Sequence, residues 1–229
     1  MTSEEGMCAN CGALRQGPFC SQCGQKQAHS NPSLEEFFHD VLHELVHLDG
    51  KIWHSVVYLL ARPGFLTRER FEGRRIRYVS PLRLYLTFSL IYFAVAAFVP
   101  SEGDLETLVR WGHRLMFFFV PLFAGFVALT TRSTGRHFVP HLEFSLHYLA
   151  VWFLLTTLTT ISGLAAVPYV SATISMAANA ASFVYLVLAL RKAYGFPFFG
   201  ALWRSCAISI GVQGTLILLL RLVFVVPEN

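Results

Sequence analysis

Long apolar runs without charge fill most of this chain after Ser80. Five of these runs reach or approach the roughly 20 residues that a helix needs to cross about 30 Å of hydrocarbon. With 54% hydrophobic and 14% charged residues and a mean hydropathy of +0.50, the chain is not an ordinary soluble protein. We predict a mainly α, polytopic helical membrane protein with about five transmembrane helices, near residues 82–99, 114–131, 142–166, 169–190 and 203–226.

The basic residues predict how these helices are oriented. Lys and Arg near span ends accumulate on the cytoplasmic side of a membrane. Here they cluster before the first predicted span and after the second and the fourth, whereas the loop from Ser101 to His113 is mainly acidic. The N-terminus also lacks the basic start and apolar stretch of a secretory signal. We therefore expect a cytoplasmic N-terminus and a C-terminus on the periplasmic or outer side.

Two C-x-x-C pairs near the N-terminus form the strongest motif in the chain. Each pair, Cys8 with Cys11 and Cys20 with Cys23, is followed by a glycine that eases a tight turn. This spacing lets both thiolates reach one ion at roughly 2.3 Å. In a reducing compartment, cysteines bind metal more readily than they form disulfides. The alternative of redox-active dithiols is less favoured, because no βαβ pattern surrounds either pair. We predict a zinc ribbon whose zinc is structural, because four thiolates leave no position for water or substrate.

Residues 33–50 are predicted to form an amphipathic helix with three histidines on one face. His39, His43 and His47 follow one another at intervals of four residues. The string from His43 through Glu44 to His47 also matches the zincin pattern, in which two histidines bind catalytic zinc and the glutamate activates water. Catalytic metal, a non-catalytic metal or anion site, and structural histidines at the membrane surface stay open as interpretations.

Three more histidines lie around the start of the third predicted span, on the same expected side of the membrane. His141 and His147 sit among apolar residues, where an ionisable group is costly and indicates either a function or a firm hydrogen-bond partner. Histidines from both segments could hold a second metal ion. The candidate ligands are His39, His43, His47, His137, His141 and His147.

Residues 51–62 are predicted to form a shorter helix that ends at Pro63-Gly64. Basic residues then alternate with Phe, Ile, Tyr and Val up to Arg83, a pattern suited to the lipid headgroup layer. Because this segment adjoins the first span, we favour membrane lipids as its ligands and expect no nucleic acid. The predicted headgroup-binding residues are Arg68, Arg70, Arg74, Arg75 and Arg77.

These features divide the chain into three parts. Residues 1–28 hold the four-cysteine zinc ribbon, and residues 29–80 hold the His-rich helix and the basic amphipathic segment. Residues 81–229 form the predicted transmembrane domain.

The chain resembles a family of bacterial membrane proteins known as domain of unknown function 3667. The resemblance rests on the paired knuckles with Cys23-Gly24-Gln25, on motifs between His43 and Pro81 that include Leu60-Ala-Arg-Pro-Gly64, and on His141-Leu-Glu-Phe-Ser-Leu-His147. It implies the same architecture of ribbon, basic segment and several spans, in a bacterial inner membrane. It implies no particular activity.

Three kinds of function fit this architecture, and we favour the first. A scaffold at the cytoplasmic membrane face would bind a cytosolic protein through its ribbon. A hydrolytic or lipid-modifying membrane metalloenzyme would use the histidine cluster, with His43, Glu44 and His47 as catalytic candidates. A transporter or channel subunit, helped by close packing in a homo-oligomer, would need a polar interior. That interior would consist of Arg221, Asn179 and Gln213.

Overall fold

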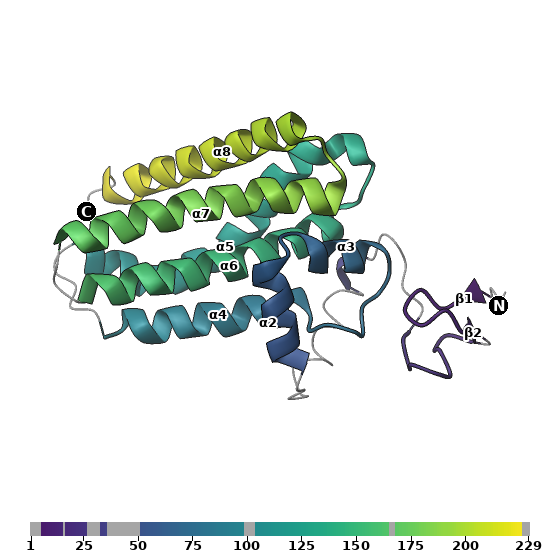
Figure 1. The fold of residues 1–229 in the computed structure, drawn as a ribbon. Helices are drawn as coiled ribbons and strands as arrows, with labels where there is room; N and C mark the ends of the chain where they lie inside the picture. The colour runs from purple at the N-terminus through teal and green to yellow at the C-terminus, as the bar shows by residue number, and fades with distance from the viewer. Residues whose placement is uncertain are drawn as a thin grey trace.

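The fold is described by a computed structural model that covers residues 6–15, 17–26, 33–35, 51–98, 104–164 and 168–225. Most of it is a bundle of helices that lie side by side (Figure 1). The bundle consists of α4 (Pro81–Ala96), α5 (Asp104–Thr131), α6 (Phe138–Leu164), α7 (Pro168–Tyr194) and α8 (Phe198–Val225).

Three of these helices are long and apolar enough to cross a membrane, namely Phe138–Gly163, Tyr169–Tyr194 and Phe198–Leu218. Two further apolar helical stretches, Pro81–Ala96 and Phe118–Thr134, are shorter. All five predicted spans thus lie on apolar helices, and three of these reach spanning length within the described residues. The chain is therefore mainly helical and has three candidate membrane-spanning helices among its described residues.

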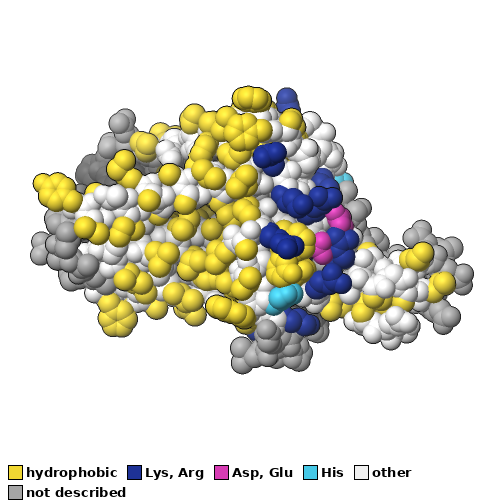
Figure 2. Space-filling view, viewed as in Figure 1, with side chains coloured by type: hydrophobic (Ala, Val, Ile, Leu, Met, Phe, Trp, Pro, Cys, Tyr) yellow, Lys and Arg dark blue, Asp and Glu magenta, His cyan; other side chains and the backbone are white. Residues whose placement is uncertain are grey.

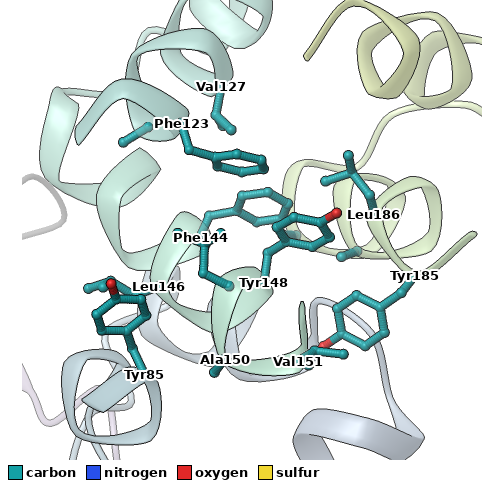
Figure 3. Packing of buried hydrophobic residues seen from close by; sticks show 14 of the residues in the cluster. Tyr85, Phe123, Val127, Phe144, Leu146, Tyr148, Ala150, Val151, Tyr185 and Leu186 are labelled. Atoms are coloured by element: carbon teal, nitrogen blue, oxygen red, sulfur yellow. The ribbon is translucent and has the colours of Figure 1, made fainter. Parts of the chain in front are cut away.

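Helix α6 is the centre of the bundle and contacts α4, α5 and α7. Every residue from 139 to 151 is buried, because other helices surround this part of α6. Polar residues are buried there too, namely His141, Glu143, Ser145 and His147. Phe144 and Tyr148 of α6 fill the space between Phe123 of α5 and Leu186 of α7 (Figure 3). The Phe123 and Tyr148 rings stack with their centroids 5.0 Å apart, and the Tyr148 hydroxyl shares a 2.9 Å hydrogen bond with Ser182.

Two short helices, α2 (Lys51–Ala61) and α3 (Phe65–Phe71), cap one end of the bundle (Figure 1). The boundary of α2 confirms the predicted end before Pro63-Gly64. The hydroxyl of Tyr185 in α7 donates a 2.8 Å hydrogen bond to the carbonyl of Leu59, and the Val79 amide donates to the Ser55 hydroxyl at 2.9 Å. Buried hydrogen bonds therefore fix α2 to α7 and to the segment just before α4.

The two ends of the bundle differ in chemistry. Exposed apolar side chains cover its length, whereas Lys and Arg gather at the end that carries α3 (Figure 2). A small N-terminal module with the strands β1 (Gly6–Met7) and β2 (Leu14–Arg15) lies beyond this basic end, and α8 finishes at the opposite end (Figure 1). The basic end is therefore where the polar N-terminal part meets the apolar bundle.

Gly64, in the turn between α2 and α3, lies against the backbone of α7. Its φ is +74°, and an added Cβ would lie 2.4 Å from the carbonyl oxygen of Ala189. We expect Gly64→Ala to destabilise the protein by about 2–5 kcal/mol, because a left-handed residue with a Cβ costs about 1–2 kcal/mol and overpacking costs about 1–3 kcal/mol. Thermal unfolding in detergent measures the loss.

Gly195→Ala is the matched control for that variant. Gly195 has nearly the same φ, +76°, but no atom lies within 4 Å of the place that an added Cβ would take, so only the conformational cost applies. An equal loss in both variants would show that contact with Ala189 does not matter.

Candidate metal centre and its docking onto the membrane helices

Each C-x-x-C pair forms a tight, hydrogen-bonded turn. In the first, the Cys8 amide donates to the Ala13 carbonyl at 2.8 Å and the Gly12 amide donates to the Cys8 carbonyl at 2.8 Å. The second repeats this pattern, from Cys20 to Gln25 at 2.9 Å and from Gly24 to Cys20 at 2.8 Å. Both glycines have the positive φ, +75° and +71°, that such a turn requires.

The two turns bring the four cysteine sulfurs together. All four Sγ atoms lie within 4.8 Å of one another, with Cys8 3.6 Å from Cys23 and Cys11 3.5 Å from Cys20. Ligands at about 2.3 Å from a tetrahedral zinc ion are about 3.8 Å apart. The sulfur cluster therefore has the size of a four-thiolate metal site, and Cys8 and Cys20 are buried within it.

Backbone amides in the turns favour the thiolate form that a metal needs. The amides of Cys23 and Gln22 lower the pKa of the Cys20 thiol to about 6. The amide of Cys11, followed by that of Asn10, lowers the pKa of the Cys8 thiol. Thiolates, not thiols, are the metal ligands, so the turns prepare one cysteine of each pair for metal binding.

Gln25 attaches this module to the helices at the basic end. Its side-chain amide donates from Nε2 to the Gly73 carbonyl at 2.6 Å and accepts at Oε1 from the Arg75 amide at 3.2 Å. The residue is only 4% exposed. The Gln25 side chain thus donates to one backbone group of the loop after α3 and accepts from another, as the backbone of a neighbouring β-strand does.

The rest of the module exposes apolar side chains. Met7, Leu14 and Phe19 are 75%, 69% and 59% exposed. Phe19 pairs with Lys26 in an isolated antiparallel bridge, so its backbone is held while its ring projects outward. A module this small has almost no apolar core, and the four cysteines are its main internal link.

The arginines predicted to bind headgroups have different environments. Arg74 pairs with Glu69 and Glu72, which raises the Arg74 pKa above its usual range. Arg68 forms a half-exposed i,i+4 pair with Glu72, whose pKa falls because Arg68 donates to it. Arg77 is exposed and Arg75 is half-buried. Only part of this segment is therefore turned outward.

Arg70 instead points into the protein and pairs with Glu143 of α6. Its Nη2 is 2.7 Å from Glu143 Oε1, and the side chains are 9% and 2% exposed. One turn along each helix, the Thr67 hydroxyl shares a 2.9 Å hydrogen bond with Nδ1 of His147. One face of α3 thus meets one face of α6 through a buried ion pair and a buried hydrogen bond.

His141 has its own partners inside the bundle. Its Nδ1 lies 2.8 Å from the Tyr194 hydroxyl and 3.2 Å from the Thr131 hydroxyl, and its ring stacks on that of Tyr194. His147 lies in a narrow crevice, where its Nε2 has no hydrogen-bond partner among the described residues. These two histidines thus have firm hydrogen-bond partners, which was one of the two interpretations of their place in an apolar span.

The second-metal hypothesis is only partly covered by the structure. Among the residues that it describes, the cysteines are the one group of three or more potential ligands close enough for an ion. His137 is exposed at the start of α6, apart from the buried His141 and His147. The other candidate ligands, His39, His43 and His47, lie outside the described residues, as does the catalytic candidate Glu44. A second metal therefore stays a prediction.

The structure describes the side chains of two of the three polar residues considered for a transport pathway. Asn179 and Gln213 are exposed, on α7 and α8 respectively, and the Asn179 amide donates to the Ser175 carbonyl within its own helix at 2.8 Å. The side chain of Arg221 is outside the described part of α8.

Two important residues were not identified from the sequence. Glu143 is the acidic partner of Arg70. A glutamate inside an apolar span is costly unless it is paired, so its presence in a chain with an arginine-rich segment was a signal that could have identified this pair. Gln25 docks the cysteine module, but a single glutamine after a knuckle carries no signal of a distant partner.

Comparison with known proteins gives a family match over part of the chain. No curated protein and no solved structure matches the sequence. Residues 49–93, which include α2, α3, the loop that receives Gln25 and most of α4, match the family described as "Protein of unknown function (DUF3667)".

Proposed function

We propose that this protein is a membrane scaffold whose cysteine module binds structural zinc and presents a docking surface for a protein partner at the cytoplasmic face. The observation that carries the proposal is the buried Gln25 contact, which holds the module at the basic end of the bundle. The module keeps Met7, Leu14 and Phe19 exposed, and apolar side chains on a rigid frame are typical anchors of protein interfaces.

The cytoplasmic placement is part of the same proposal. The module lies at the end of the bundle where Lys and Arg gather (Figure 2). Positive residues next to spanning helices favour the cytoplasmic side. Zinc is favoured over other metals because a closed set of four thiolates with tetrahedral dimensions is the usual structural zinc site.

Photocrosslinking in cells tests this function. Phe19 is replaced by a benzoyl-phenylalanine of similar shape, and adducts of the full chain are analysed after irradiation. We expect a protein adduct from position 19, and lipid adducts from the same probe at Phe199, which is 77% exposed on α8.

Gln25→Ala in the same experiment tests the role of rigid docking. Loss of two hydrogen bonds, each contributing about 1 kcal/mol, should lower the yield of the protein adduct severalfold while the metal stays bound. Gln22→Ala removes an exposed glutamine of the same module and should change nothing. The scaffold proposal fails if position 19 gives no protein adduct, or if Gln25→Ala leaves its yield unchanged.

A further inference from the structure

A groove of about 430 Å³ lies between the turn that follows α2 and the C-terminal end of α7. Ligand sites commonly have volumes of about 300–1,000 Å³. No residue of the cysteine module and neither Arg70 nor Glu143 lines this groove. Its walls are formed by Arg62, Pro63, Leu188, Arg191, Lys192, Gly195 and Phe196.

Three of these residues are exposed cations, Arg62, Arg191 and Lys192, and no acidic residue lines the groove in the described part of the chain. Arg62 lies over the Tyr58 ring at 5.1 Å and Arg191 over the Phe198 ring at 5.7 Å. Contacts with rings orient a guanidinium group without neutralising its charge. The carboxylates of Glu69, Glu72 and Glu143 pair with other arginines. The three cations of the groove therefore stay available for a ligand.

The other side of the groove is apolar and continues along the bundle. Leu188 is 39% exposed, and Val184, one turn earlier on α7, is 54% exposed. Ala180, a further turn away, is exposed as well. Residues four apart share one helix face, so an apolar track leads from the cationic groove along the outer surface of α7.

We propose that this groove binds an anionic phospholipid, with the phosphate held by Arg62, Arg191 and Lys192 and an acyl chain lying along Leu188 and Val184. The three cations would bind the anionic headgroup, and the apolar track would contact the acyl chain of the lipid. The groove also lies at the end of a candidate spanning helix, where headgroups are expected. A free phosphate would satisfy only the cationic part.

Lipid binding to the purified full-length protein in a neutral detergent tests the site. Phosphatidylglycerol is the probe, phosphatidylcholine with the same chains is the neutral reference, and inorganic phosphate is the competitor. We expect phosphatidylglycerol to bind more tightly than phosphatidylcholine. Arg191→Gln combined with Lys192→Gln should weaken phosphatidylglycerol binding about 25-fold, because each cation contributes about fivefold.

Lys51→Gln combined with Arg132→Gln is the matched control, since it removes one lysine and one arginine that are exposed and lie outside the groove. We expect less than about a twofold change in affinity for phosphatidylglycerol from this pair, given that an exposed charge outside a site contributes little. Equal weakening by both pairs would assign binding to diffuse surface charge and overturn the proposal. Competition by inorganic phosphate at the concentration of the lipid would overturn the role of the acyl chain.

Discussion

Removal of the metal should unfold the cysteine module and leave the helix bundle intact. Of the described residues in this module, only Cys8, Cys20 and Gln25 are buried, and its sheet has two strands of two residues each. Such a small apolar core cannot offset the entropy of ordering the chain. Structural zinc contributes about 10–16 kcal/mol in comparable small sites. We therefore expect a folded module only when the metal is bound.

Hydrogen exchange of the full-length protein in detergent measures this effect. After chelation, the amides of Cys8, Gly12, Cys20 and Gly24, which are hydrogen-bonded in the turns, should exchange at least about 100-fold faster. Amides in α6 should keep their protection. Protection that persists in the turns after complete metal loss would show that the module folds without metal.

A pair of serine variants provides the control for that result. Cys20→Ser removes a buried ligand and should abolish binding of one zinc ion per chain. Cys206→Ser makes the same chemical change at an exposed position of α8, outside the sulfur cluster, and should keep the metal. Metal content measured on both variants separates loss of a ligand from a general effect of thiol removal.

The helices were predictable because each one satisfies its own backbone hydrogen bonds and needs only local sequence. The ends of the helices were harder to predict than their existence. The predicted fourth span stops at residue 190 and the fifth starts at 203, whereas α7 continues to Tyr194 and α8 begins at Phe198. The charged residues Arg191, Lys192 and Arg204 mark the end of the apolar stretch rather than the end of the helix, since charges are tolerated in helical turns at the interface.

The polar contacts at the basic end could not be predicted from local pattern. Five arginines before the first span suggested one common ligand, but Arg70 pairs with a glutamate 73 residues away and Arg74 pairs with carboxylates on its own segment. Gln25 likewise finds its partners 48 and 50 residues along the chain. Tertiary packing gives arginines of one segment different partners. The residue pattern within that segment carries no information about partners that lie far away in the sequence.

Arg70→Met should be the most destabilising of the arginine substitutions in this segment. It leaves the Glu143 carboxylate, 2% exposed, without its partner. Breaking a buried pair by removing one partner costs about 3–5 kcal/mol. At about 2–4 °C per kcal/mol for a chain of this size, we expect the Tm in detergent to fall by about 10 °C. Thermal unfolding followed by circular dichroism measures the change.

Arg68→Met is the matched control, because Arg68 also pairs with a glutamate but both side chains are half-exposed, at 51% and 37%. Such pairs contribute about 0–1 kcal/mol, so its Tm should change by no more than about 4 °C. Combining Arg70→Met with Glu143→Met removes both buried charges and should recover most of the lost stability. If the double variant is as unstable as Arg70→Met, the loss arises from packing of the arginine side chain rather than from a buried unpaired carboxylate.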